Sequence, residues 1–108
     1  MSEQELNQGY YMHNGTIYYS VEVTTRKTRL GRTSVERCVS YGIVKPVPGL
    51  EVAQPEIEGP FYSEADLTRL RRVRRLINEL GLNWAGVEVV MRLTDELEGL
   101  RLELSRLS

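Results

Sequence analysis

The sequence predicts a mainly α-helical domain with a small β component, in which a winged helix-turn-helix body precedes a long C-terminal helix. Three observations predict this class. Two short helical segments lie about four residues apart, as in a helix-turn-helix unit. A segment rich in proline and glycine follows them, which favours a wing. Near the C-terminus, leucine or valine then recurs at alternating steps of three and four, which is typical of a helix that pairs with another helix.

The N-terminal 19 residues predict a tail and a hairpin. Residues 1–9 have low hydrophobicity, and we expect them to form a mobile tail. Residues 10–19 predict a β-hairpin, because Asn14-Gly15 favours a two-residue turn and aromatic and β-branched residues flank it. His13 stands just before the turn, and we expect it to be an exposed strand residue rather than a ligand.

The helix-turn-helix unit is predicted from its capping residues. Residues 20–29 form a short helix with Ser20 as the N-cap. Thr33 or Ser34 caps a second helix, which stops at Gly42. We take residues 20–82 as one helix-turn-helix domain, including the wing and the helix that follows it.

The wing is predicted from residues that disfavour regular structure. Residues 43–47 read as a strand limited by Pro46, since proline cannot donate to a strand ladder. Residues 48–60 contain three prolines and two glycines, and we expect a loop or wing there without an element of its own.

Two longer helices complete the chain. Ser63 and Asp66 resemble a capping box, and apolar residues at helical spacing follow as far as Gly81. Asn83 then caps a last helix, over residues 84–107. We take residues 83–108 as a dimerisation helix.

The last helix contains an apolar seam with the a and d spacing of a coiled coil. At 1.5 Å per residue the helix is about 36 Å long, longer than so small a body can cover. The alternative is that this face packs on the protein's own body, but we expect a homodimer. The seam consists of Val90, Leu93, Leu97, Leu100, Leu104 and Leu107.

Composition bounds the classes of function. The single cysteine, Cys38, cannot form an internal disulfide, which fits a reducing compartment. No apolar run approaches the roughly 20 residues that a membrane helix needs, so we expect a cytoplasmic protein without a membrane partner. The net charge of −1 conceals segregation: residues 47–66 carry five acids and no base, whereas residues 67–82 carry five arginines and one glutamate.

Residues for catalysis or metal binding are sparse. Nucleophilic catalysis needs a nucleophile, a base and an orienting group, and zinc needs three or four close ligands. His13 and Cys38 are isolated in the sequence. Gly81 and Gly86 have the spacing that begins a phosphate loop, but Val87-Glu88 follow where lysine and serine or threonine are required. We therefore expect a non-enzymatic protein without cofactors or metals.

Several motifs carry a resemblance to the MerR superfamily of winged helix-turn-helix proteins. Residues 20–46 align with that family's opening pattern, with Ser34-Val35 at its usual Thr-Leu and Gly42-Ile43-Val44 at its Gly-Leu-Leu. Residues 62–67, Tyr-Ser-Glu-Ala-Asp-Leu, resemble the family's Tyr-Ser-x-x-Asp-Leu. Residues 80–90 resemble the heat-shock regulator HspR and, more closely, the chaperone modulator family CbpM. The resemblance covers about residues 19–108.

The CbpM resemblance implies a protein that binds the J-domain of a DnaJ-like co-chaperone and limits its work with Hsp70. J-domains display a basic helix, which an acidic wing or an acidic C-terminal helix could meet. We expect acidic wing residues and aromatic anchors to be the docking candidates. These are Glu51, Glu56, Glu58, Phe61 and Trp84.

The alternative is a DNA-binding transcriptional regulator like HspR. DNA-binding members have an arginine and two aromatic residues where this chain has Glu36-Arg37-Cys38, and their wings carry arginines where this wing is acidic. Each lost cationic contact weakens binding to phosphate, which disfavours DNA as a partner without excluding it. The basic residues left for DNA are Arg26, Lys27, Arg29, Arg32 and Arg37.

Overall fold

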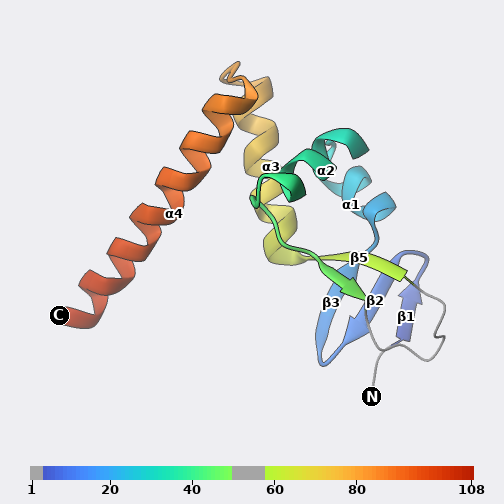
Figure 1. Ribbon diagram of the computed structural model, residues 1–108. Coiled ribbons are helices and arrows are strands. Elements are labelled where there is room, and N and C mark those ends of the chain that lie inside the picture. The colour runs from blue at the N-terminus through green and yellow to red at the C-terminus, as the bar shows by residue number, and fades with distance from the viewer. Residues whose placement is uncertain (1–3, 50–57) are drawn as a thin grey trace.

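The computed structural model describes residues 4–49 and 58–108 (Figure 1). Three strands open the chain, two short helices follow, a two-stranded wing comes next, and two longer helices complete it. The elements are β1 (Gln4–Asn7), β2 (Tyr10–His13), β3 (Thr16–Tyr19), α1 (Val21–Thr28), α2 (Arg32–Ser40), β4 (Val47–Gly49), β5 (Glu58–Ser63), α3 (Glu64–Asn78) and α4 (Trp84–Leu107).

The predicted N-terminal hairpin is confirmed, and a third strand extends it. β2 and β3 pair antiparallel around Asn14 and Gly15, both at positive φ, as a primed two-residue turn requires. The prediction of a mobile tail is wrong for residues 4–7, because β1 pairs with β2 in an antiparallel ladder. Main-chain hydrogen bonds build such a ladder, and hydropathy does not report them. Residues 1–3 lie outside the described residues.

One continuous sheet joins the hairpin to the wing, in the order β1-β2-β3-β5-β4. Tyr18 pairs with Ser63 and Tyr19 with Tyr62, so the strand that precedes α1 lies beside the strand that precedes α3. This arrangement fixes the wing to the body of the protein (Figure 1).

The wing has more regular structure than the sequence predicted. Of the strand expected over residues 43–47, only Val47 is in a strand, where it pairs with Phe61. The expectation of a plain loop over residues 48–60 is also wrong, because residues 48–49 belong to β4 and residues 58–60 to β5. Pro48 is tolerated because β4 is an edge strand. A Cβ on Gly59 would overlap the Pro48 carbonyl, so this close approach requires glycine.

Local capping explains most helix boundaries. The side chain of Ser20 accepts a hydrogen bond from Val23 N, and the Ser63–Asp66 capping box is complete in both directions. The side chain of Asn83 accepts from Gly86 N and begins α4 as predicted. The predicted start of α2 is wrong by two or three residues: the N-cap is Gly31, whose backbone is extended, and no side chain caps this helix.

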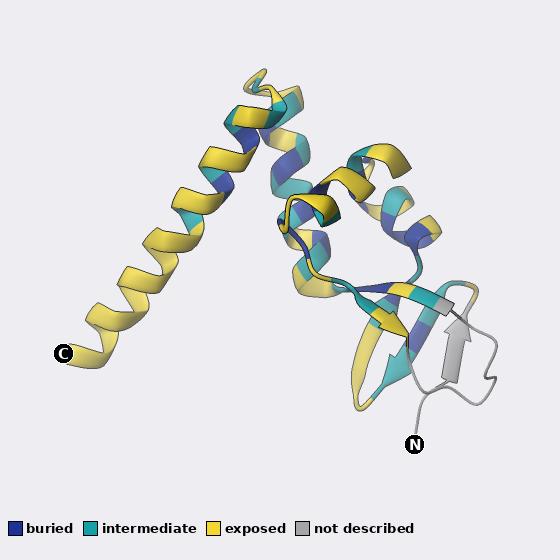
Figure 2. Ribbon diagram, in the orientation of Figure 1, coloured by how far each residue is buried: buried dark blue, intermediate teal, exposed yellow. Residues whose placement is uncertain are grey.

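The core lies between α1, α2, α3 and the first two turns of α4. Its fully buried members include Val35, Cys38, Leu67 and Leu70, and α4 adds Val87 and Met91. After Met91, α4 leaves the body, and most of its remaining length is exposed (Figure 2). Within the described residues, no helix combines the length and the apolar character needed to cross a membrane.

A single arginine fixes the direction in which α4 leaves. Arg69 donates from Nε to the carbonyl of Ile43 at 2.6 Å, and its two terminal nitrogens reach the carboxylate of Asp95 at 2.8 and 3.0 Å. The hydrogen bond from Arg69 holds the pKa of Asp95 below its usual value. Arg69 therefore ties α3, the segment after α2 and the middle of α4 together.

Candidate interaction surfaces

The apolar seam of α4 is largely uncovered. Val90 is half-buried against the core, but the exposed fraction rises from 49% at Leu93 to 84% at Leu107. Leu97, Leu100 and Leu104 lie between these values, at 59 to 67%. All six residues belong to one helix, and the five leucines extend beyond the body (Figure 2). Exposed apolar surface of this extent is typical of a protein–protein contact.

Arg32, at the start of α2, the second helix of the helix-turn-helix unit, lies beside two carboxylates. Arg32 Nε donates to Glu36 at 3.3 Å, and its Nη1 lies 3.6 Å from Glu22 of α1. Arg32 and both carboxylates are largely exposed, so each pair adds little stability. Their charges nevertheless offset one another, and the start of α2 therefore presents little net positive charge from Arg32.

An aromatic cluster lies where the end of α2 meets the start of α4. The guanidinium of Arg37 lies 5.2 Å from the centre of the Trp84 ring, and the Tyr41 ring meets Trp84 edge-on at 6.2 Å. Trp84 is half-buried and Tyr41 is 42% exposed. Tyr41 was not among the predicted site residues, because nothing in the local pattern around it signals its contact with a residue 43 positions away.

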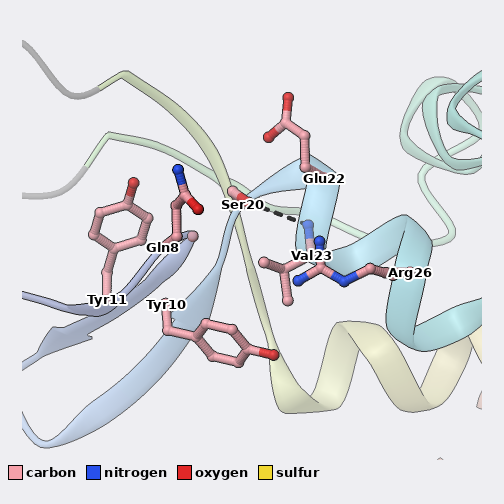
Figure 3. A pocket seen from close by; sticks show the side chains of 8 residues that line it. Gln8, Tyr10, Tyr11, Ser20, Glu22, Val23 and Arg26 are labelled. Atoms are coloured by element: carbon pink, nitrogen blue, oxygen red, sulfur yellow. Dashed lines mark hydrogen bonds between the residues drawn. The ribbon is translucent and has the colours of Figure 1, made fainter.

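The remaining predicted DNA contacts have different surroundings. Arg26 borders a hollow of about 520 Å³ between α1 and the turn from β1 to β2, which Gln8, Tyr10 and Glu22 also line (Figure 3). Lys27 lies over the rings of Tyr10 and Tyr19, at 5.9 and 5.5 Å. Arg26, Lys27 and Arg32 therefore have three different surroundings: the hollow, the two tyrosine rings, and the carboxylates of Glu22 and Glu36.

Arg29 has a structural role as well as a charge. It is the C-cap of α1 and has a φ of 64°, in the left-handed region that few side chains adopt. Its backbone N–H donates to the Thr25 carbonyl at 2.8 Å. Arg29 lines a groove between α1 and α3 together with Lys27.

The structure places the predicted docking residues of the wing differently. Phe61 is 1% exposed and packs edge-on against Tyr11 at 5.1 Å between ring centres, so its prediction as a surface anchor is wrong. It pairs with Val47 inside the sheet, where a large aromatic ring is best buried. Glu51 and Glu56 lie outside the described residues. Glu58 opens β5 opposite Gly49, and its side chain is also outside the description.

Burial favours the neutral form of two titratable groups of the core. Burial raises the pKa of the Cys38 thiol to about 11, so the thiol is protonated at neutral pH. Burial also raises the pKa of Tyr62 to about 12, with Glu36 adding to the effect. In the described part of the chain, no three His, Cys, Asp or Glu side chains gather into a possible metal site.

Comparison with known proteins identifies the family. No curated protein sequence matches the chain. The model of a family described as "MerR HTH family regulatory protein" matches residues 19–108, from the end of β3 to the C-terminus. The match covers the helix-turn-helix unit, the wing, α3 and all of α4, and it leaves out most of the N-terminal hairpin. The chain therefore belongs to the MerR family of helix-turn-helix regulatory proteins.

Proposed function

We propose that this protein is a non-enzymatic, cytoplasmic regulator that binds the J-domain of a DnaJ-like co-chaperone and limits its work with Hsp70. The observation that carries the proposal is the composition of the surface formed by α2 and the start of α4. This surface combines two carboxylates beside Arg32 with a partly exposed cluster of Trp84, Tyr41 and Arg37.

That composition suits a protein partner. Tryptophan, tyrosine and arginine are the residues most enriched among those that dominate the binding energy of protein interfaces. The carboxylates of Glu22 and Glu36 oppose phosphate, whereas they favour a basic partner such as the charged helix of a J-domain. The similarity of residues 80–90 to CbpM, which includes Trp84, supports the same reading.

We also propose that the protein acts as a homodimer paired through the distal half of α4. Each leucine of the seam is about half exposed or more within its own chain. A second copy offers the same spacing of a and d positions, so the two stripes can interdigitate. Pairing of this kind leaves the cluster around Trp84 free on each body, because Trp84 lies at the opposite end of α4.

The test is calorimetry or surface plasmon resonance with an isolated J-domain from the same cell. Trp84→Ala should weaken binding about 30-fold, because truncating a central aromatic anchor removes about 2 kcal/mol or more. Tyr41→Ala, at a more exposed position, is the second variant and should weaken binding less. Leu102→Ala is the matched control, because Leu102 is exposed but lies far along α4 from the cluster.

Two results would contradict the proposal. Intact protein that shows no J-domain binding at micromolar concentration excludes the co-chaperone. Tight binding to a specific DNA duplex instead makes the protein a transcriptional regulator. If the carboxylates oppose DNA, Glu36→Arg should raise the weak duplex affinity and steepen its salt dependence.

A further inference from the structure

A second charged surface lies on another side of α1, away from α2. The last turn of α1 and the body of α3 enclose a groove of about 430 Å³. All its lining residues come from residues 27–29 and 68–79, and none comes from α2 or the wing. The contact between α1 and α2 that involves Arg32 is made through Glu22, at the opposite end of α1. The groove is therefore separate from the surface proposed for the J-domain.

The groove is strongly cationic. Its six basic residues face a single acidic one, Glu79. One of them, Arg71, has an ion pair, with Glu64 at 3.5 Å. Arg72 also acts electrostatically on Asp95. The six are Lys27, Arg29, Arg71, Arg72, Arg74 and Arg75.

One atom in the groove lacks a partner where a partner is expected. Arg74 Nε is buried, and no atom of the described residues accepts its hydrogen bond. A buried donor without an acceptor is unfavourable, and it is more unfavourable when it belongs to a charged group. Arg74 therefore combines a desolvated donor with a charge that no ion pair among the described residues offsets, and an anion bound in the groove would offset that charge.

The spacing of the arginines adds to this effect. Arg74 and Arg75 follow Arg71 by three and four residues, and Arg75 follows Arg72 by three, so the members of each of these pairs are neighbours on the surface of α3. Like charges at these separations repel and destabilise a helix. Binding of an anionic group would relieve the repulsion, so part of the protein's stability is linked to ligand.

The geometry favours carboxylates on a flexible segment over a DNA duplex. A winged protein holds a duplex with its recognition helix, and α2 has no part in this groove. Its volume is that of a pocket for a few side chains. The guanidinium fork of arginine binds a carboxylate through two parallel hydrogen bonds, so inserted side chains can be recognised individually.

We propose that the groove between the end of α1 and α3 binds an acidic peptide segment of a protein partner, with Arg74 as the central contact. This site goes beyond the co-chaperone function and does not depend on it. The protein would then hold two partners of opposite charge on separate surfaces: a basic one beside α2 and an acidic one beside α3.

The experiment measures fluorescence anisotropy of a labelled peptide of alternating glutamate and serine, against the full-length protein at about 0.15 M salt. Arg74→Gln should weaken binding about tenfold, since a hydrogen bond between charged groups contributes about 1.5–3 kcal/mol. Arg75→Gln, at an exposed position of the groove, is a second variant that leaves the buried contacts in place and should weaken binding by a smaller factor. Arg101→Gln makes the same charge change on the distal half of α4 and should change nothing.

Three other outcomes would contradict the proposal that this groove binds an acidic peptide. Equal losses in Arg74→Gln, Arg75→Gln and Arg101→Gln would mean that only net charge matters. Failure of the peptide to bind, or equal binding of a glutamine-for-glutamate peptide, overturns the proposal. If duplex DNA displaces the peptide, and Arg74→Gln weakens DNA binding more than peptide binding, the groove is a nucleic-acid site. J-domain binding should be the same in Arg74→Gln and wild type, so failure of either proposal leaves the other testable.

Discussion

The two halves of α4 have apolar residues at similar spacing, but only the first half is buried. Val87 and Met91 are 0% and 1% exposed because α3 and the other helices of the body lie against them. From Leu93 onward, the same helix extends beyond the body, and each seam leucine is about half exposed or more (Figures 1 and 2). Periodicity therefore identifies an apolar face, but the size of the body decides how much of that face it can cover.

The largest expected effect comes from placing a charge in the first half. Val87→Glu should abolish cooperative folding, because an unpaired charge in a closed core costs several kcal/mol and the whole domain has only about 5–15 kcal/mol of stability. Far-UV circular dichroism and urea titration measure the loss. Leu97→Glu is the matched change in the second half and should leave the body folded. A wild-type urea midpoint in Val87→Glu would show that α4 does not complete the core.

The second prediction compares a seam leucine with a leucine outside the seam, both in the distal half of α4. Leu97→Glu should weaken dimerisation at least about 100-fold, because the charge would be buried between two helices at a cost of several kcal/mol. Sedimentation equilibrium should then give a monomer. Leu102→Glu is the control, since Leu102 is almost equally exposed, at 63% against 62%, but lies on another side of the helix from the seam. If Leu102→Glu dissociates the dimer and Leu97→Glu does not, the seam is assigned to the wrong face.

The smallest effect concerns the junction between the halves. Because Arg69 lowers the pKa of Asp95, the ion pair stabilises the folded state above the unfolded pKa of about 4, and this stabilisation is lost as the pH falls through the lowered folded value. Asp95 is about half exposed, so Asp95→Asn should cost about 1 kcal/mol or less at pH 7.

The measurement is the urea midpoint of wild type and Asp95→Asn at a series of pH values. The difference between the two proteins should begin to shrink as the pH falls below about 4, and it should go on shrinking as the pH falls through the lowered folded pKa of Asp95. Glu98→Gln removes an exposed carboxylate three residues further along α4 and should have little effect at any pH. A difference between wild type and Asp95→Asn that stays constant as the pH falls below about 4 would mean that the amide disturbs packing rather than an ion pair.

Features set by neighbours in the chain could be predicted from the sequence. Ser20, the Ser63–Asp66 pair and Asn83 all cap helices as expected, because a cap joins residues two or three positions apart. The first residue of α4 was predicted for the same reason. The hairpin turn at Asn14-Gly15 depends equally on local backbone conformation.

Features set by distant partners could not be predicted. β1 forms because β2 offers it a ladder, and residues 58–60 are extended because they pair with β4. Phe61 and Trp84 were equivalent candidates by residue type, but Phe61 lies inside the sheet and Trp84 at the edge of the helical core. The charge run of α3 was visible in the sequence, but the groove that it forms with Lys27 and Arg29 depends on how α1 crosses α3.

The contact between Arg69 and Asp95 gives α4 the mechanics of a lever. Twelve residues follow Asp95 in the helix, so the arm beyond this pivot is about 18 Å long at 1.5 Å per residue. A tilt of about 10° at the pivot would displace the tip by about 3 Å, and the same tilt in a symmetric pair would act twice on the separation of the two bodies. Arg69 also binds the Ile43 carbonyl just after α2. A partner that shifts this segment would therefore move Arg69, and with it the contact to Asp95. In the proposed dimer, the helix would then convert a small displacement beside α2 into a larger one between the two bodies.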